Sequence, residues 1–248
     1  MKSPYLRWPL RRRAAHVPEC NGQINALVRL TLAVLVAGAA CASQSRITPA
    51  AASFDPTLLD PSAAAFSASA PDSFIARFQT SRGDFAVRVV RAWSPRGADR
   101  FYNLVRLGFF DRQKFFRVRA NFIAQFGLHP DPRVIAAWKN QAMPDDTARV
   151  SNMRGTLAYA MLTTPNTRTT QIFINLADNT RLDAEGFAPF GRIVQGVAVI
   201  DSLYAAYDER AGGGMRAGNQ GPIEREGNAW LERNFPKLDS IVRVTLVR

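Results

Sequence analysis

Cysteine is nearly absent from this chain of 248 residues, and its two cysteines, Cys20 and Cys41, lie before the part that has globular periodicity. Residues 42–248 contain no thiol. This absence excludes a disulfide framework, a cysteine-ligated zinc site and a cysteine nucleophile from that part of the chain. It also suits an oxidising compartment, where a free thiol is a liability.

Histidine is equally scarce, because only His129 lies beyond the N-terminal region. A single histidine beside Pro130 in an expected loop supplies neither a Ser-His-Asp triad nor a metal site, and we expect it to be a solvated surface residue. Phosphate-binding signatures are missing as well, since Gly212-Gly213-Gly214 lacks the strand and helix that a nucleotide loop requires. The sequence predicts no metal ion and no nucleotide.

Acidic residues are outnumbered, with 20 Asp and Glu against 32 Lys and Arg, and the net charge is +12. Such a balance permits attraction to nucleic acid or anionic lipid. However, the longest uninterrupted basic block is Arg11-Arg12-Arg13, within the N-terminal region. We therefore expect a solvated basic surface and no nucleic-acid partner.

The apolar run over residues 30–40 is too short for a membrane span, because it has eleven residues and a spanning helix needs about 20. Basic residues precede it and small residues follow it, which predicts a secretory signal over residues 1–41. A buried helix is the alternative. The protein is thus expected to be exported, either as a periplasmic protein or as a membrane-anchored lipoprotein.

Two processing routes are open for this signal. Ala39-Ala40-Cys41 is similar to the end of a bacterial lipobox, in which the cysteine is lipidated, although Gly38 stands where leucine is usual. Ala-x-Ala patterns such as residues 37–39 suit ordinary cleavage instead. We favour lipidation of Cys41 and a membrane tether through it, because a lone cysteine at this place is otherwise unexplained.

Residues 42–72 are rich in Ala, Ser, Pro and Asp and show no sustained period, which predicts a flexible linker.

Hydrophobic periodicity begins at residue 74. Apolar residues alternate over residues 74–79 and 85–89 around a Gly-containing turn, which predicts two paired strands. Ser94-Pro95 and Gly108 mark the two ends of a helix. Further strands are expected at residues 115–118, 122–126, 155–161, 171–175, 190–194 and 241–247, and a second helix at 197–207. Many short strands with two helices indicate a mainly β protein with a closed antiparallel barrel, since closure removes exposed sheet edges.

Five motifs follow one another along this region. Residues 115–125 have the pattern F-x-R-V-x-x-x-F-x-x-Q, residues 154–160 the pattern R-G-x-x-x-x-A, and residues 170–174 the pattern T-Q-x-F-I. Leu182-Asp183 and the F-G-containing segment 187–196 complete the set. Together these motifs resemble the cyclophilin family of peptidyl-prolyl cis-trans isomerases over about 175 residues. The resemblance implies a cyclophilin-like barrel capped by two helices over residues 73–248, isomerase activity, proline-containing polypeptides as substrates, no cofactor and a monomer.

The resemblance also implies roles for individual residues. Arg117, Phe122 and Gln125 would be catalytic. The substrate would be bound by Ile123, Ala160, Met161, Gln171, Phe173, Leu182 and Phe187. Arg181 takes the place of a tryptophan that is associated in the family with tight cyclosporin binding.

The chemistry of proline isomerisation suits such residues. The barrier to rotation about a peptide bond is about 18–20 kcal/mol, and exchange of an X-Pro bond breaks no bond. In the twisted transition state the proline nitrogen gains a lone pair, so a fixed guanidinium stabilises that state more than either ground state. The resemblance implies that Arg117 is this donor. An arginine amid apolar strands is costly to bury without a partner, and a role in a cleft explains its place there.

Three alternatives are open. Phe122, Ile123 and Phe173 could be ordinary core residues, as most strand aromatics are. The domain could be a binding module that grips proline-containing segments without turning them over. It could also be a scaffold within a structural envelope protein, in which case no apolar pocket is expected beside Arg117.

Overall fold

The structure is a computed structural model that describes residues 54–213 and 220–247. The predicted signal sequence, Cys41 and the first part of the predicted linker lie outside the described residues. Eight strands are present in this part of the chain: β1 (Ser73–Thr80), β2 (Gly83–Val90), β3 (Arg117–Arg119), β4 (Ile123–Phe126), β5 (Thr156–Tyr159), β6 (Ile172–Asn175), β7 (Pro189–Gln195) and β8 (Ile241–Val247).

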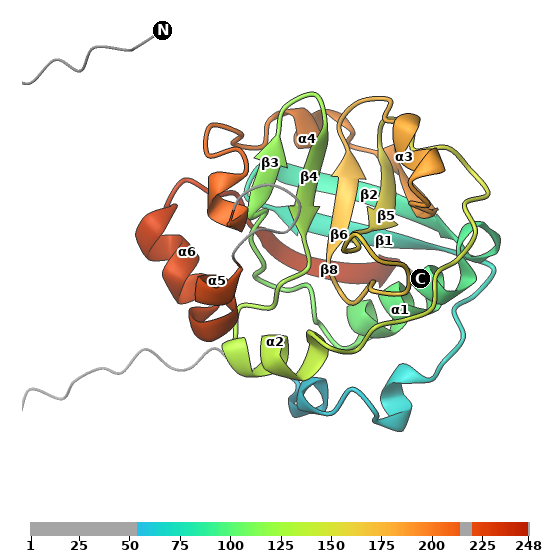
Figure 1. Ribbon diagram of the computed structural model, residues 1–248, viewed down its shortest axis with the longest axis horizontal. Helices are drawn as coiled ribbons and strands as arrows, with labels where there is room; N and C mark the ends of the chain where they lie inside the picture. Colours follow the sequence, from blue (N-terminus) through green and yellow to red (C-terminus); the bar gives the residue numbers. More distant parts are fainter. Residues whose placement is uncertain (1–53, 214–219, 248) are drawn as a thin grey trace, which may run out of the picture. The chain divides into compact units, whose positions relative to one another are not determined.

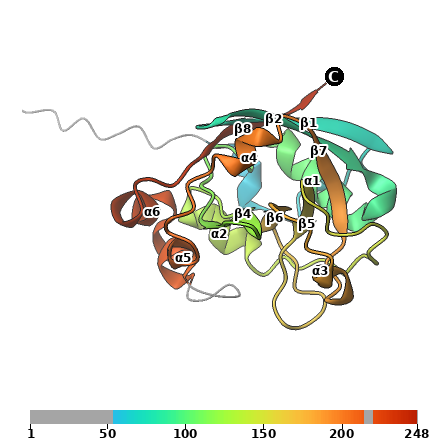
Figure 2. The ribbon, with the colours of Figure 1, turned by 90° about the horizontal axis from the view of Figure 1, so that it is seen from above.

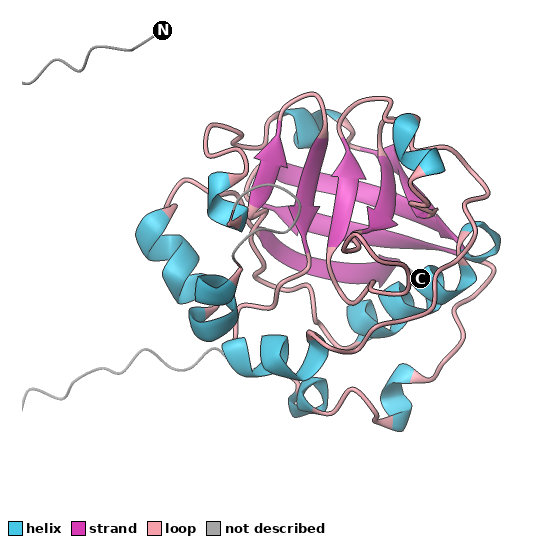
Figure 3. Cartoon of the chain, in the orientation of Figure 1, coloured by secondary structure: helices cyan, strands magenta, loops and turns pink. Residues whose placement is uncertain are grey.

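Six α-helices accompany these strands in the described residues: α1 (Pro95–Arg106), α2 (Pro132–Trp138), α3 (Arg181–Ala184), α4 (Ala198–Asp201), α5 (Gly221–Glu226) and α6 (Asn228–Asn234). Figure 3 shows that the helices surround the sheet and do not interrupt it. Four 3-10 helices add short turns: η1 (Pro56–Leu59), η2 (Ala64–Phe66), η3 (Arg91–Trp93) and η4 (Arg210–Gly212). The mainly β class that the sequence predicts is therefore correct.

The strands form one antiparallel sheet in the order β3-β4-β6-β5-β7-β2-β1-β8. The sheet folds over, so that β3, β4, β6 and β5 cross in front of β2, β1 and β8 (Figure 1). Seen from above, β8, β2 and β1 lie on one side of the molecule and β4, β6 and β5 on the other (Figure 2). The inner faces of both halves can therefore share one core.

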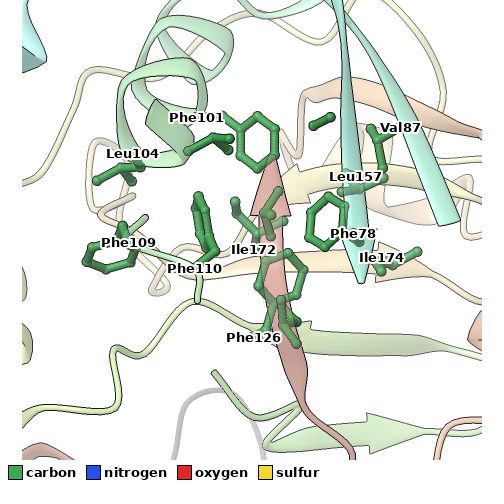
Figure 4. Packing of buried hydrophobic residues seen from close by; sticks show 14 of the residues in the cluster. Phe78, Val87, Phe101, Leu104, Phe109, Phe110, Phe126, Leu157, Ile172 and Ile174 are labelled. Atoms are coloured by element: carbon green, nitrogen blue, oxygen red, sulfur yellow. The ribbon is translucent and has the colours of Figure 1, made fainter. Parts of the chain in front are cut away.

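That core is rich in phenylalanine. Phe78 of β1 stacks on Phe85 of β2 with ring centroids 4.6 Å apart, and Phe101 of α1 contacts Phe110 and Phe190. Figure 4 shows Phe101 and Leu104 reaching from α1 toward the strands. Aromatic rings bury large apolar areas and gain from edge and offset contacts, so these side chains hold the two halves of the sheet together.

Helix α1 confirms the predicted helix, but its first turn is capped differently. Ser94 occupies the N-cap position without a capping hydrogen bond from its own side chain. Asp146, from a distant loop, accepts the Gly97 N–H at 3.0 Å and the Ser94 hydroxyl at 2.7 Å. A carboxylate satisfies free N–H groups at a helix start and favours its dipole. The predicted stop at Gly108 is confirmed, with a φ of 69° just beyond the helix.

The predicted closure of the barrel is not confirmed. In the described residues β3 and β8 are the two ends of the sheet, and only an isolated bridge between Lys114 and Ser240 joins the segments before them. Beside β3, Phe116 is buried in a second apolar cluster with residues of α2, η4, α5 and α6. A helical layer, rather than a ladder to β8, therefore covers this edge.

The second predicted helix, over residues 197–207, is wrong in extent. Helix α4 covers only Ala198–Asp201, and the chain then runs through turns to η4. Ile200 and Leu203 are both buried, and just beyond them the Tyr204 N–H donates to the Asp239 carboxylate at 2.7 Å. That bond replaces the next turn of helix.

The predicted linker is wrong for residues 54–72, which pack against the domain. Leu58 of η1 is fully buried, and its carbonyl accepts the Trp138 indole N–H of α2 at 2.8 Å. The Asn103 amide donates to the carbonyls of Phe66 and Ala68. We call residues 54–72 the strap. Its residues are mostly small or polar, but buried Leu58, the packed rings of Phe54 and Phe66 and satisfied backbone groups fix it.

Candidate functional site

The outer face of the front strands brings four side chains into one row. Arg117 of β3 lies opposite Gln125 of β4, Gln125 opposite Phe173 of β6, and Phe173 opposite Ala158 of β5. Residues in register on one face of a sheet have adjacent side chains. The register thus places the predicted catalytic arginine and glutamine beside predicted pocket residue Phe173. Figure 1 shows β3, β4, β6 and β5 side by side.

The predicted pocket residues form a cluster separate from the main core. Ile123, Phe173 and Leu182 are buried in it together with Ala158. Phe122, Ala160 and Phe187 are partly buried and pack at its margin. We call this set of seven residues the apolar pocket cluster. The alternative of ordinary barrel core does not hold for Ile123 and Phe173, which are buried in this separate cluster, and Phe122 packs at its margin.

Arg117 is held by two partners. Its side chain is only 11% exposed, and its Nη1 donates to Gln125 Oε1 at 3.1 Å. Its Nη2 forms an ion pair with Glu209, whose side chain is 12% exposed. The Nε of Arg117 is buried with no hydrogen-bond partner among the described residues. Part of the guanidinium's donor capacity therefore stays unused.

Gln125 connects Arg117 to a chain of amides. The Gln125 amide nitrogen donates to Gln171 Oε1 at 2.9 Å, and the Gln171 nitrogen donates to Gln220 Oε1 at 2.8 Å. Gln125 is 3% exposed. Buried amides that satisfy one another in series are held in fixed orientations. Gln125 therefore acts as the support of Arg117, and Gln171 supports Gln125.

Hydrogen bonds between Asp183 and the segment before β5 hold the loop that carries Leu182 and Phe187. Asp183 accepts hydrogen bonds from the Ser151 hydroxyl and from both the backbone and side-chain N–H groups of Asn152. Burial alone would raise the pKa of Asp183, but these hydrogen bonds outweigh it and lower the pKa. The Asn152 amide also donates to the Phe187 carbonyl at 2.9 Å. This network fixes the rim of the pocket cluster.

Arg168 holds the other side of the same loop. It is 4% exposed, donates to the Gly186 carbonyl at 2.6 Å and lies 5.9 Å from the ring centroid of Phe187. Asp145 pairs with it. A buried guanidinium is costly unless its surroundings supply acceptors. Because its acceptors are Gly186 at the rim and Asp145 before β5, Arg168 links the rim to the loop that precedes β5.

A cavity of about 390 Å³ adjoins the pocket cluster. Three predicted substrate residues, Ala160, Met161 and Gln171, line it, and α2 and α5 form its far wall. The other predicted site residues lie outside it. The Ala160 N–H donates to the Gln171 carbonyl at 2.9 Å. It is therefore not free to bind a peptide.

His129 is not the solvated residue that its loop position suggests. It is 2% exposed, and its Nδ1 accepts the Asp131 N–H at 3.0 Å. Its ring contacts Phe54 and Phe109 with centroids 5.3 and 5.5 Å away. Burial lowers the pKa of His129 to about 4, against the raising effect of Asp131. The side chain packs against the strap and against the segment that joins α1 to β3.

Sequence reasoning missed Glu209, Gln220 and Arg168. A buried Arg117 implied some acceptor, but Glu209 lies in a stretch without periodicity and 92 positions away. Nothing in the sequence marks that carboxylate as the partner.

In residues 54–213 and 220–247 no group of three or more His, Cys, Asp or Glu is placed to bind a metal ion. Within the same residues no helix is long and apolar enough to cross a bilayer.

Fold and site together define the class of cyclophilin-like proteins, in which a folded antiparallel sheet carries an apolar pocket beside a fixed arginine. Residues 75–221 match the family model described as cyclophilin type peptidyl-prolyl cis-trans isomerase/CLD. The chain therefore belongs to the cyclophilin-type peptidyl-prolyl cis-trans isomerases.

Individual relatives agree with this assignment. The chain is 33% identical over 132 residues to a peptidyl-prolyl cis-trans isomerase of Acinetobacter baylyi, covering 50% of this chain and 68% of that protein. It is 29% identical over 140 residues to peptidyl-prolyl cis-trans isomerase B of Escherichia coli, covering 54% and 85%. The predicted family and enzyme class are confirmed.

A solved structure supports the fold. The cyclophilin type isomerase of Cryptosporidium parvum superimposes with a TM-score of 0.51 at 18% identity, covering 71% of this chain and 98% of that one.

Proposed function

We propose that the protein accelerates rotation about X-Pro bonds in exported proteins, with Arg117 stabilising the twisted amide. The observation that carries this proposal is the row of Arg117, Gln125 and Phe173 across three paired strands. An apolar pocket accepts the proline ring, and an adjacent fixed donor meets the nitrogen lone pair only when the amide twists. No proton transfer is needed.

The supporting contacts suit this role. Gln125 holds Nη1 of Arg117, so the guanidinium pays little reorganisation when the substrate twists. Phe122, Ile123, Phe173 and Leu182 line the proline site in this proposal, and Phe187 closes its rim. The cavity beside Ala160 and Met161 accepts the residues that precede the proline. The protein acts as a monomer, exported and tethered to a membrane through a lipidated Cys41.

Arg117→Ala is the direct test. We expect the turnover rate to fall by about 10² to 10³, because one preorganised donor is worth about 3–4 kcal/mol. Substrate affinity should fall less, because the ground-state amide nitrogen is a poor acceptor. Arg117→Lys should restore little, since an ammonium cannot reach the substrate and Gln125 together. Exchange NMR on a proline-containing peptide measures the rate, and circular dichroism monitors the fold.

Arg192→Ala is the matched control, because Arg192 is an exposed arginine of β7 on the same sheet. A folded Arg117→Ala protein with more than about a third of wild-type turnover would contradict the proposal. The alternative, a non-catalytic binding module, predicts a different result. With substrate in excess the wild-type protein would then give no acceleration of proline-limited refolding.

A further inference from the structure

Glu209 is the only carboxylate paired with Arg117 among the described residues. It precedes η4 and reaches the guanidinium from the segment that follows α4. Both side chains are almost buried, at 11% and 12% exposed. Arg119, 47% exposed, approaches the same carboxylate from 3.4 Å. The pair is thus part of the site's interior and not a surface contact.

Backbone contacts fix Glu209 against β3. Asp208 forms an isolated bridge with Val118, directly beside Arg117. Gly212 packs on the arginine, because a Cβ at this glycine would lie 3.2 Å from the Cβ of Arg117. The backbone therefore places Glu209 beside Arg117, whatever conformation its side chain adopts. The turn that carries it is docked on the strand.

Two acceptors then hold the guanidinium at two nitrogens. Gln125 accepts from Nη1 and Glu209 pairs with Nη2. A planar group fixed at two of its three nitrogens has little freedom to rotate. In a reaction whose catalyst is one correctly aimed donor, small misplacements are costly.

We infer that Glu209 is a positioning residue of the isomerase site, which holds Arg117 in the orientation that meets the proline nitrogen. This inference rests on the proposed role of Arg117. Glu209 needs no contact with the substrate, and since isomerisation moves no proton, its carboxylate acts only by binding Nη2.

A purely structural role would have a different signature. Breaking a buried ion pair leaves an uncompensated charge and destabilises the fold, whereas losing a positioning contact lowers turnover in a protein that is still folded. Glu209→Gln separates the two, because its amide oxygen still accepts from Nη2 without the charge. Glu209→Ala removes both the charge and the acceptor.

The experiment compares Glu209→Ala, Glu209→Gln, Arg117→Ala and the matched control Glu226→Ala, whose glutamate pairs with Arg233 on exposed helices. Each purified protein is assayed well below its melting temperature. We expect Glu209→Ala to lower kcat about tenfold with KM changed less than about twofold. Glu209→Gln should restore most of kcat, and Glu226→Ala should match wild type.

A spectroscopic readout accompanies the kinetics. The Nε–Hε resonance of Arg117, assigned by its loss in Arg117→Ala, should shift or broaden in Glu209→Ala and stay near its wild-type position in Glu209→Gln. Unchanged kcat and an unchanged resonance in Glu209→Ala would overturn the inference, as would a lower melting temperature with normal kcat. If Arg117→Ala itself retained activity, the proposed function would fail instead.

Discussion

The surroundings of two side chains, His129 and Arg181, set their chemical behaviour. His129 is one of them, since its imidazole is buried between the rings of Phe54 and Phe109 and is held neutral. Arg181 is another, with its guanidinium 4.8 Å from the ring centroid of Phe122 and an ion pair to Glu185. Each gives a prediction at the scale of one side chain.

The pKa of His129 predicts a pH-dependent stability. Its folded value of about 4 lies below an unfolded value of about 6.5, so between these values the unfolded chain binds the extra proton. Stability therefore rises with pH across this window. From pH 7 to pH 5 the free energy of unfolding should fall by about 2 kcal/mol. Urea titrations at several pH values measure it.

His129→Gln is the control for this slope, because glutamine keeps an acceptor for the Asp131 N–H and does not titrate. The variant should lose most of the pH dependence between pH 5 and pH 7. Asp183 loses its contribution only in more acidic solution, because its pKa is lowered from a value already near 4. Equal slopes in wild type and His129→Gln would rule out His129 as the cause.

Arg181 predicts weak binding of cyclosporin, which follows from the resemblance to the family. A flexible cation lacks the flat apolar face and the N–H donor of an indole. Losing such an anchor costs about 2 kcal/mol, roughly thirtyfold in affinity. Arg181→Trp should gain affinity by calorimetry, while Glu185→Ala, which only frees Arg181, should not. No gain would count against this placement of Arg181 on the pocket.

At the scale of elements, the strap and α2 form one unit. The Trp138 indole N–H donates to the Leu58 carbonyl. The ring of Phe66 packs edge-on against the Trp138 ring, with centroids 4.8 Å apart. Helix α2 in turn supplies Ile135, a wall residue of the cavity beside Ala160. The strap thus supports the helix that bounds the cavity beside Ala160.

Leu58→Ala tests this support. Leu58 is fully buried, so its truncation should lower the free energy of unfolding by about 2–5 kcal/mol. Leu59→Ala is the matched control, because Leu59 is 42% exposed and should change stability by less than about 0.5 kcal/mol. Chemical denaturation measures both. Two indistinguishable variants would show that the strap does not contribute to the fold.

At the scale of the whole molecule, the proposed lipid anchor at Cys41 would set how far the domain can move from its membrane. Twelve residues separate Cys41 from Phe54, where the described chain begins. At about 3.3–3.6 Å per extended residue they reach no more than about 45 Å. Because the strap is folded, the tether is shorter than the 31 residues of the predicted linker, and a lipidated protein would work close to its membrane.

Cys41→Ser tests this tether. The variant should move from the membrane fraction to the soluble part of the export compartment, whereas Cys20→Ser, the matched control, should not. The reason is that lipidation requires the cysteine at the new amino terminus. Mass spectrometry of the mature wild-type protein checks the same point, since a chain that begins beyond Cys41 would falsify the lipoprotein prediction.

The sequence by itself determined the family, the sheet-forming segments and six of the seven residues of the apolar pocket cluster. Local patterns sufficed there, because alternation fixes which face a strand side chain occupies, and Arg117, Gln125 and Phe173 each belong to a short motif. The first helix was equally readable from Pro95 and Gly108.

Only the tertiary structure decided the contacts that join distant segments. Leu58 lies 80 positions from Trp138, and Glu209 lies 92 positions from Arg117. Such pairs depend on how the sheet folds over and where the later helices dock, which no local period encodes. The same reason explains the burial of His129 and the absence of a ladder between β3 and β8. Composition described the strap as a linker, whereas the packing of Leu58, Phe54 and Phe66 makes it part of the domain.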